Sequence, residues 1–327
     1  MPLPAAALRY PYKRVLLQRT RLAYVHLGNL LTDAMRDRAA RVYGYVLVWL
    51  PDELLLFYLQ EGEVVNATAS ADGRRFRALP IAAALAKVPS AAEVGEICFH
   101  QCEDEQLATM FWSQMLEPVA WPPGVNLDDA RAVAEFLHAI VHDGVVEVCA
   151  DGGLNYVVVR DGRLIRAFFA DPATRDLQAG FAALFHSSHE SVATLRSRLW
   201  PVPPPLPVQA PPALIRAYRE LMEGVVARLV GLGATSAPAV AEHARRLLSE
   251  NHAALEHFAL AESDPADPVT ETPALSAAIG AWLGDLLLTT APPDGASPGR
   301  LIGEVAHDRR HVFQSAGLFD ALPWKVE

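Results

Sequence analysis

Residues 44–68 read GYVLVWLPDELLLFYLQEGEVVNAT, and residues 144–168, 100 positions later, read GVVEVCADGGLNYVVVRDGRLIRAF. The same offset holds without a gap between residues 25–67 and 125–167 and gives ten identities in 43 positions. Typical residue frequencies would give roughly three. A spacing of 100 residues is too long for a solenoid repeat and is typical of two tandem copies of one compact domain. The N-terminal part of the chain is therefore predicted to be one small fold used twice.

Each copy has a hairpin signal at the same place in its sequence. An acidic residue and a glycine, Glu61-Gly62 and Asp161-Gly162, separate two runs rich in β-forming residues. A two-residue type I′ turn requires positive φ at both central positions, and glycine adopts positive φ without steric cost. Each copy is thus expected to be a helix that leads into a three-stranded meander. Helices are expected at residues 29–41, 80–88, 103–116, 128–141, 171–185 and 190–200, and a further strand at residues 94–101.

The middle strand of each meander is apolar without alternation, as the runs at residues 54–59 and 156–159 show. Such a run indicates a strand that is covered on both faces. Helices can cover one face, so the other is expected to meet the sister copy and form a pseudo-dimer within the chain. Burial against another chain, in a homo-oligomer, is the alternative.

A proline-rich stretch divides the chain at residues 201–212, where seven of twelve residues are proline. Such a segment prefers extended polyproline II and would be a semi-rigid spacer of roughly 35 Å, or would dock in an aromatic groove of a partner. Beyond it the strand signals disappear. The predicted class is α+β, with a first α/β module at residues 1–100, a second at 101–200, the linker at 201–212 and an all-helical bundle at 213–327.

Composition restricts the class of partner. The chain has 327 residues, 51% of them hydrophobic, and a net charge of −10, which argues against a nucleic-acid interface. The basic stretch at residues 9–21 is expected to be a solvated lead-in segment, and contact with a membrane or an acidic partner is the alternative. No run reaches the roughly 18 apolar residues of a membrane span, and residues 1–8 lack the pattern of a signal peptide. Together with three cysteines, these features predict a cytoplasmic protein.

Cys98, His100 and Cys102 are the first group that could bind a metal, because they fall within five residues and are zinc-binding types. A structural zinc site needs four ligands, typically in two pairs, and the sequence has no second pair. They are expected to be ordinary residues on one face of the strand at 94–101.

Two helical groups resemble metal motifs only in part. His186, His189 and Glu190 have the order His-x-x-His-Glu, which does not place two ligands around a general base as zinc proteases do. Glu304, His307 and His311 share a predicted helix face and contain the Glu-x-x-His fragment of di-metal bundles. That fragment needs a second copy and further carboxylates. Both groups are therefore expected to be structural or solvated.

Catalytic motifs are absent from the sequence. It contains no Gly-x-Ser-x-Gly elbow, no phosphate-binding loop, no dinucleotide fingerprint and no His-Glu-x-x-His. We therefore assign no catalytic, cofactor-binding or metal-binding residue and no cofactor, and we favour a protein that is not an enzyme.

The pattern Gly44-x-Val-x-Val, the apolar run 54–59 and Glu61-Gly62 with the strand that ends at Ala67 resemble the PATAN-type bacterial domain. The second copy is similar over its corresponding 25 residues or so. This resemblance implies a non-catalytic interaction module of bacterial signalling and surface-motility control, often coupled to receiver domains. The chain departs from the pattern because it has no recognisable receiver domain and adds the helical bundle.

The sequence thus predicts a cytoplasmic adaptor or scaffold that binds protein partners in bacterial signalling or motility control. The alternative is a small-molecule sensor or an enzyme with a pocket between the two copies, where clefts commonly form.

Overall fold

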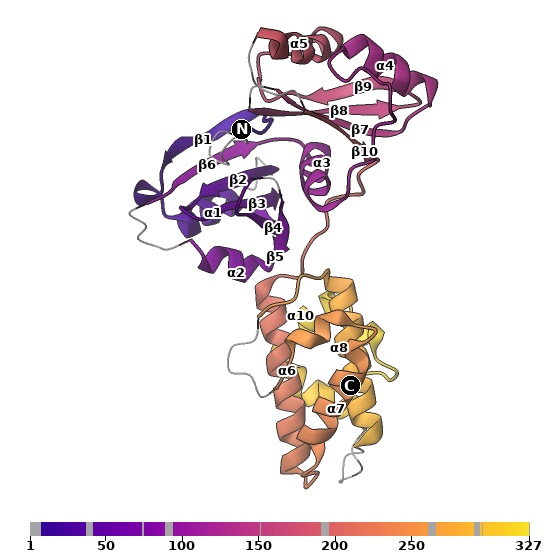
Figure 1. The fold of residues 1–327 in the computed structure, drawn as a ribbon. Helices are drawn as coiled ribbons and strands as arrows, with labels where there is room; N and C mark the ends of the chain where they lie inside the picture. Colours follow the sequence, from indigo (N-terminus) through magenta and orange to yellow (C-terminus); the bar gives the residue numbers. More distant parts are fainter. Residues whose placement is uncertain are drawn as a thin grey trace. The chain divides into compact units, whose positions relative to one another are not determined.

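The computed structural model describes residues 8–36, 42–73, 75–88, 94–150, 152–190, 196–260, 266–290, 295 and 297–326; for residues 186–190 and 196 it describes the backbone only. Contacts divide the chain into two compact units. The first contains Met1–Leu79 and Ala86–Pro207, and the second contains Pro80–Leu85 and Val208–Glu327. The first holds the sheets, and the second is helical (Figure 1). The predicted α+β class is therefore confirmed.

The first unit contains two antiparallel sheets. The larger has, in spatial order, β1 (Arg14–Arg21), β6 (Glu96–Gln101), β2 (Gly44–Trp49), β3 (Leu54–Gln60), β4 (Glu63–Ser70) and β5 (Arg77–Leu79). The smaller has β10 (Arg196–Pro201), β7 (Gly144–Ala150), β8 (Gly153–Arg160) and β9 (Arg163–Phe168). Both sheets therefore extend beyond the expected three-stranded meander. Residues 14–21, expected to be a solvated lead-in, form β1 because they pair with β6.

The two meanders have the same register. Gly44 pairs with Leu59, and Gly144 pairs with Val159. The pairing of the second and third strands of each meander has its irregularity at the same point, between Tyr58 and Leu59 of β3 in one copy and between Val158 and Val159 of β8 in the other. The offset of the sequence thus appears again in the hydrogen-bonded pairs.

The turns have the predicted backbone geometry. Glu61 and Gly62 have φ values of 51° and 85°, and Asp161 and Gly162 have 49° and 68°. In each copy the amide of the turn glycine donates to the carbonyl that lies two residues before β2 or β7. Both type I′ hairpin turns are therefore confirmed.

The fourth strand of the smaller sheet corrects a prediction. Residues 190–200 were expected to be helical, but residues 196–201 form β10. Gly144 pairs with Pro201 just as Gly44 pairs with Gln101, so β10 corresponds to β6 at the same offset. The sequence RSRLWP has no strand periodicity of its own, and pairing with the edge of β7 decides its structure.

Helices cover the outer faces of the sheets. α1 (Leu27–Arg36) lies against β4, and a short 3-10 helix, Leu22–Tyr24, precedes it. α4 (Ala130–Ala139) and α5 (Leu177–Glu190) lie on the smaller sheet, on the side away from the larger one (Figure 1). With β7 and β8 they form a separate buried cluster that includes Val133, Leu137, Val157 and Phe181.

A second buried cluster of the first unit contains side chains of both sheets. α3 (Asp104–Met115) lies between the sheets and contributes to it (Figure 1). Both faces of β3 and β8 are therefore covered, as their apolar runs predict. The cluster includes Leu54, Leu56 and Tyr58 of β3, Leu107 and Phe111 of α3, and Tyr156 and Val158 of β8.

The second unit is built on helices with one common core. They are α6 (Pro212–Gly231), α7 (Ala237–Ser249), α8 (Thr272–Thr289), α9 (Pro298–Ala306) and α10 (Arg310–Ser315), with 3-10 helices at Ala253–His257, His307–Arg309 and Phe319–Ala321. α2 (Ile81–Ala86) falls almost entirely within the part of the chain assigned to this unit. Among the described residues α8 is long and apolar enough to cross a membrane, but Trp282, Leu283 and Leu286 are fully buried in the core.

The proline-rich segment makes specific contacts with each unit, so it is not the detached spacer that its composition suggests. On the side of the first unit, Leu206 is 5% exposed within the cluster between the sheets, and Asn66 Nδ2 donates to the Pro207 carbonyl over 3.0 Å. On the side of the second unit, the Ala210 amide donates to the Thr270 carbonyl over 2.8 Å. Proline lacks the amide hydrogen that regular strand pairing needs, but it does not prevent the segment from packing against a unit.

Candidate functional site

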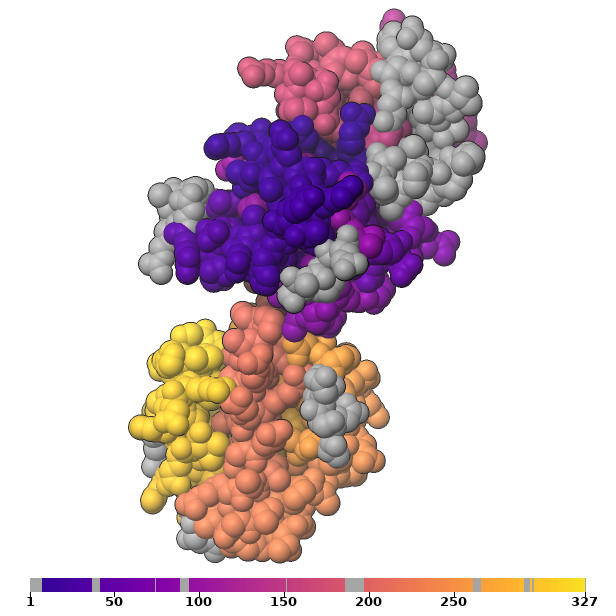
Figure 2. All heavy atoms as spheres, turned by 90° about the vertical axis from the view of Figure 1, so that its left-hand side faces the viewer, coloured from indigo at the N-terminus to yellow at the C-terminus, as the bar shows by residue number. Residues whose placement is uncertain are grey.

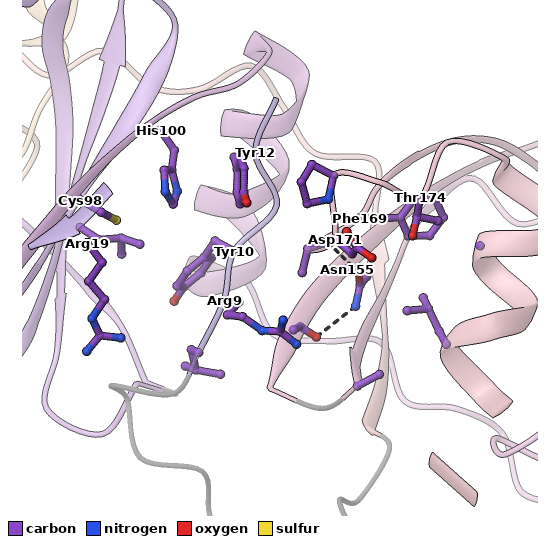
Figure 3. Close-up of a pocket in the computed structure, with 18 of the residues that line it drawn as sticks. Arg9, Tyr10, Tyr12, Arg19, Cys98, His100, Asn155, Phe169, Asp171 and Thr174 are labelled. Carbon is purple, nitrogen blue, oxygen red and sulfur yellow. Dashed lines mark hydrogen bonds between the residues drawn. The ribbon is translucent and has the colours of Figure 1, made fainter. Parts of the chain in front are cut away.

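A pocket of about 590 Å³ lies in the first unit and is lined by residues of both the predicted first module (1–100) and the predicted second module (101–200) (Figure 3). Ligand pockets typically measure about 300–1,000 Å³. One wall comes from β1, β2, β6 and the segment at residues 8–12, and the other from β8, residues 169–174 and α5. Figure 2 shows the indigo atoms of the N-terminal segment and β1 beside the rose-coloured atoms of the second module.

The N-terminal segment is held in place by the second module. The Arg9 amide donates to the Gly152 carbonyl, and the Leu154 amide donates to the Arg9 carbonyl, each over 2.8 Å. These bonds form a short parallel bridge to β8. They fix the backbone of Arg9 at the pocket, and in Figure 3 Arg9 and Tyr12 lie between the two walls.

His100 on β6 lines the pocket and has a defined tautomer. Tyr45 Oη lies 2.9 Å from His100 Nδ1 and 2.9 Å from the Pro11 carbonyl. A carbonyl can only accept, so Tyr45 donates its proton there and His100 Nδ1 donates to Tyr45. Burial lowers the pKa of His100 to about 4, so the ring is neutral near pH 7 and Nε2 carries a lone pair. The Tyr12 ring lies against this imidazole with 4.5 Å between centroids.

Cys98 and Cys102 are both buried in the cluster that contains side chains of both sheets, and Cys98 and His100 also line the pocket. Burial raises the pKa of the Cys98 thiol to about 12, and burial also raises that of Cys102. Within the described ranges no three His, Cys, Asp or Glu side chains come together in a way that could hold a metal ion.

Arg19 of β1 stands at the edge of the pocket in a fixed orientation. Its guanidinium lies over the Trp49 ring, 4.2 Å from the centroid. Arg19 Nε donates to Glu96 Oε2 over 2.8 Å, and Nη2 contacts the same oxygen. The ion pair with Glu96 and the cation–π contact with Trp49 together restrict the Arg19 side chain.

The wall from the second module is ordered by polar side chains that sequence reasoning missed. Asn155 Nδ2 donates to the Val148 and Gly153 carbonyls, and its Oδ1 accepts from the Ala170 amide over 2.8 Å. Asp171 Oδ1 accepts from the Ala173 amide over 2.9 Å. The sequence Asp-Pro-Ala-Thr at 171–174 is a turn signal that could have located this wall.

Gly180 explains how α5 approaches that wall so closely. A Cβ atom at this position would lie 2.6 Å from Cζ of Phe169. Phe169, which also lines the pocket, can therefore pack against the helix only because residue 180 has no side chain.

A buried carboxyl group, Glu147, lies in β7 in the same unit and is 7% exposed. Burial raises its pKa to about 7, although Arg198 and a hydrogen bond from Ser113 act in the other direction. Arg198 Nε lies 3.9 Å from Glu147 Oε1. Sequence reasoning missed this residue because a polar side chain in an apolar strand usually faces water.

His186, His189 and Glu190 belong to α5, and their side chains lie outside the described part of the structure. Glu304 accepts from Arg300 Nε over 3.0 Å and is exposed.

The predicted continuous helix through Glu304, His307 and His311 is wrong. α9 ends at Ala306, a 3-10 turn spans His307–Arg309, and α10 begins at Arg310. The turn interrupts the 3.6-residue periodicity, so the three residues do not share one regular helix face.

Chemically, the pocket offers cations, hydrogen-bond acceptors and aromatic rings. Its thiol is protonated near pH 7, because the pKa of Cys98 is about 12. Comparison of the chain with protein-family models, with curated proteins and with solved structures found no match.

Proposed function

We propose that this chain is a non-catalytic adaptor whose first unit binds a small molecule in the pocket between its two modules. The observation that carries the proposal is the pocket itself, at about 590 Å³ and with both modules in its walls. A ligand that contacts both walls would stabilise their contact, which is how binding would be communicated to a protein partner.

The state of the ionisable groups supports binding over catalysis. Cys98 keeps its proton near pH 7, and a thiol is a poor nucleophile. His100 Nδ1 is bonded to the hydroxyl of Tyr45, whereas a catalytic base is commonly oriented by a carboxylate. Asp171 uses one carboxylate oxygen to order its own turn.

We also infer that the two modules form a pseudo-dimer of PATAN-type domains. The matching registers of the two sheets and their common buried cluster support this relation. Action in the cytoplasm, a protein partner and a role in bacterial signalling or motility control belong to the same proposal.

The proposal is tested by native mass spectrometry of the full chain and by analysis of the small molecules released when it is denatured. Ala183→Trp would fill the pocket, because Ala183 lines it from an exposed position on α5. Ala179→Trp is the matched control, since Ala179 is exposed on the same helix but does not line the pocket. We expect a bound molecule with the wild type and the control and none with Ala183→Trp. No bound molecule, together with no thermal shift across a metabolite panel, would contradict the proposal.

A further inference from the structure

The two copies differ at one edge of their sheets. In the first copy β4 pairs with β5, so that Ala67 lies opposite Leu79. In the second copy β9 is the last strand of its sheet, and no further strand of the described ranges pairs with it (Figure 1). An edge strand presents unpaired N–H and C=O groups, to which an extended segment can bond. β9 therefore has an open position where β4 has a partner strand.

Burial differs at equivalent positions of these two strands. Val65, the bulged residue of β4, is 8% exposed, whereas its counterpart Ile165 is 47% exposed. Asn66 is buried and donates to the Pro207 carbonyl, whereas its counterpart Arg166 is exposed. Two extended segments thus contact β4, one in β5 and one in the proline-rich stretch. A similar segment on β9 would give the second copy the cover that β4 already has.

Two cations face each other at the hairpin end of β9. Arg160 and Arg163 lie directly opposite each other across the turn, and both are exposed. Neither guanidinium has an ion pair or hydrogen bond within the part of the chain that the structure describes. Like charges at such a cross-strand pair are destabilising, and the corresponding pair of the first copy is Gln60 and Glu63. A bound carboxylate would offset the repulsion in the second copy.

The same face of β9 already contacts carboxylates. The register of β8 and β9 places Arg166 on the face that carries the Arg160–Arg163 pair. Arg166 contacts Glu103, and its Nη1 donates to Glu105 Oε2 over 2.8 Å. Carboxylates of α3 and of the residue before it thus occupy Arg166 and leave the arginine pair for another anion. The charge of this edge therefore matches an acidic partner.

We propose that β9 is a docking edge for an extended acidic segment of a protein partner. Main-chain hydrogen bonds to β9 align the segment, its carboxylates bind Arg160 and Arg163, and one of its apolar side chains packs on Ile165. A second copy of this chain is disfavoured at the edge, because it would bring the same cations together. The inference rests on the proposed adaptor function and names the class of its protein partner.

Fluorescence anisotropy with the full chain tests the edge with three labelled peptides, in which Glu alternates with Val, Lys with Val, and Glu with Pro. We expect the Glu–Val peptide to bind. The other two should bind at least tenfold more weakly, because lysine repels the arginine pair and proline lacks the N–H that strand pairing needs. Equal binding of the Glu–Pro peptide would mean charge attraction without strand addition. Binding of no peptide at millimolar concentration would mean that the arginine pair only protects the edge from aggregation. Either result would overturn the inference.

Variants and hydrogen exchange locate the contact. Arg163→Glu should weaken binding of the Glu–Val peptide at least tenfold and strengthen that of the Lys–Val peptide. It replaces a repulsive pair in the hairpin by an attractive one, so the fold should be retained. Arg14→Glu is the matched control, since Arg14 is an exposed cation on β1, the edge strand of the other sheet. Amides of residues 163–168 should gain protection when the Glu–Val peptide binds, and those of β1 should not. An equal loss with Arg14→Glu, or protection of β1 in place of β9, would overturn the assignment.

These outcomes are distinguishable from failure of the proposed ligand pocket. If no peptide binds but native mass spectrometry finds a small molecule that Ala183→Trp loses, the pocket stands and the docking edge is wrong. If the Glu–Val peptide binds and no small molecule is found, the docking edge stands and the pocket proposal is wrong. A concentration-dependent dimer with protected β9 amides in the absence of peptide would show that a second copy occupies the edge, and would overturn the inference.

Discussion

At the scale of single residues, burial decides the chemistry of the first unit. Glu147 and His100 both lie where desolvation disfavours the charged form, so the pKa of the carboxyl rises to about 7 and that of the imidazole falls to about 4. The two shifts make the free energy of unfolding depend on pH in opposite directions, over windows that overlap from about pH 4.5 to about pH 6.5.

Glu147→Gln should change the pH dependence of stability. The carboxyl keeps its proton to a higher pH in the folded state than in the unfolded state, so stability should fall as pH rises from about 4.5 to about 7. The loss should be on the order of 3 kcal/mol, and the variant should lack it. Urea unfolding at about pH 5 and about pH 8 measures this difference. Exposed Glu117→Gln is the control, and the same slope in wild type and Glu147→Gln would contradict the expectation.

His100→Phe should remove a component of the opposite sign. The unfolded imidazole takes up a proton below about pH 6.5, whereas the folded one does so only near pH 4, so stability should rise with pH across that window. Removing the imidazole should flatten the rise in an acid-unfolding series monitored by circular dichroism. His311→Phe is the control, because His311 is exposed on α10. A rise of the same size in His100→Phe would show that His100 is not its source.

At the scale of elements, the hairpin turn is the feature that the two modules share most closely. Gly62 and Gly162 have positive φ and also lie against the helix of their own module. A Cβ on Gly162 would come within 2.7 Å of the Leu137 carbonyl oxygen, and one on Gly62 would meet the Ala34 carbonyl. Glycine is thus required for both the dihedral angle and the close approach of turn and helix.

Gly162→Ala should therefore destabilise the protein through two effects, the strain of a positive φ and the clash of the added Cβ with α4. Gly124→Ala is the matched control, because Gly124 has φ of 96° and nothing within 4 Å of the added Cβ. We expect the control to cost about 1–2 kcal/mol and Gly162→Ala to cost at least about 1 kcal/mol more. Chemical denaturation of both variants measures the difference. Equal losses would mean that α4 moves away at no cost.

At the scale of the whole molecule, the chain has two units, each with its own core. The core of the second unit is one cluster of side chains from the helices around α8. The first unit has two clusters, one between its sheets and one beneath α4 and α5. Because each unit has its own core and its own internal contacts, separate cooperative transitions are expected.

Matched core substitutions should affect one transition each. Leu55 of β3 and Leu283 of α8 are both fully buried, so Leu→Ala should cost about 2–5 kcal/mol at either site. Differential scanning calorimetry should show that Leu55→Ala lowers the transition of the first unit and Leu283→Ala that of the second. A single transition that both variants shift alike would contradict the division.

The sequence by itself determined the features that depend on short windows of the chain. The 100-residue offset, the Glu61-Gly62 and Asp161-Gly162 turns and the apolar runs of β3 and β8 act through local sterics and periodicity, and they predict the repeated meander correctly. The helical C-terminal part follows in the same way from its periodicity and helix-start signals.

Only the tertiary structure decided the features that depend on residues far apart in the sequence. β10 is a strand because the edge of β7 offers it unpaired backbone groups, which outweigh the preferences of residues 196–201. Glu147 is buried because the second face of its sheet is covered. Arg9, His100 and Asp171 line one pocket only because two modules pack together, and the free energy of that packing is distributed over contacts that no short stretch of sequence contains.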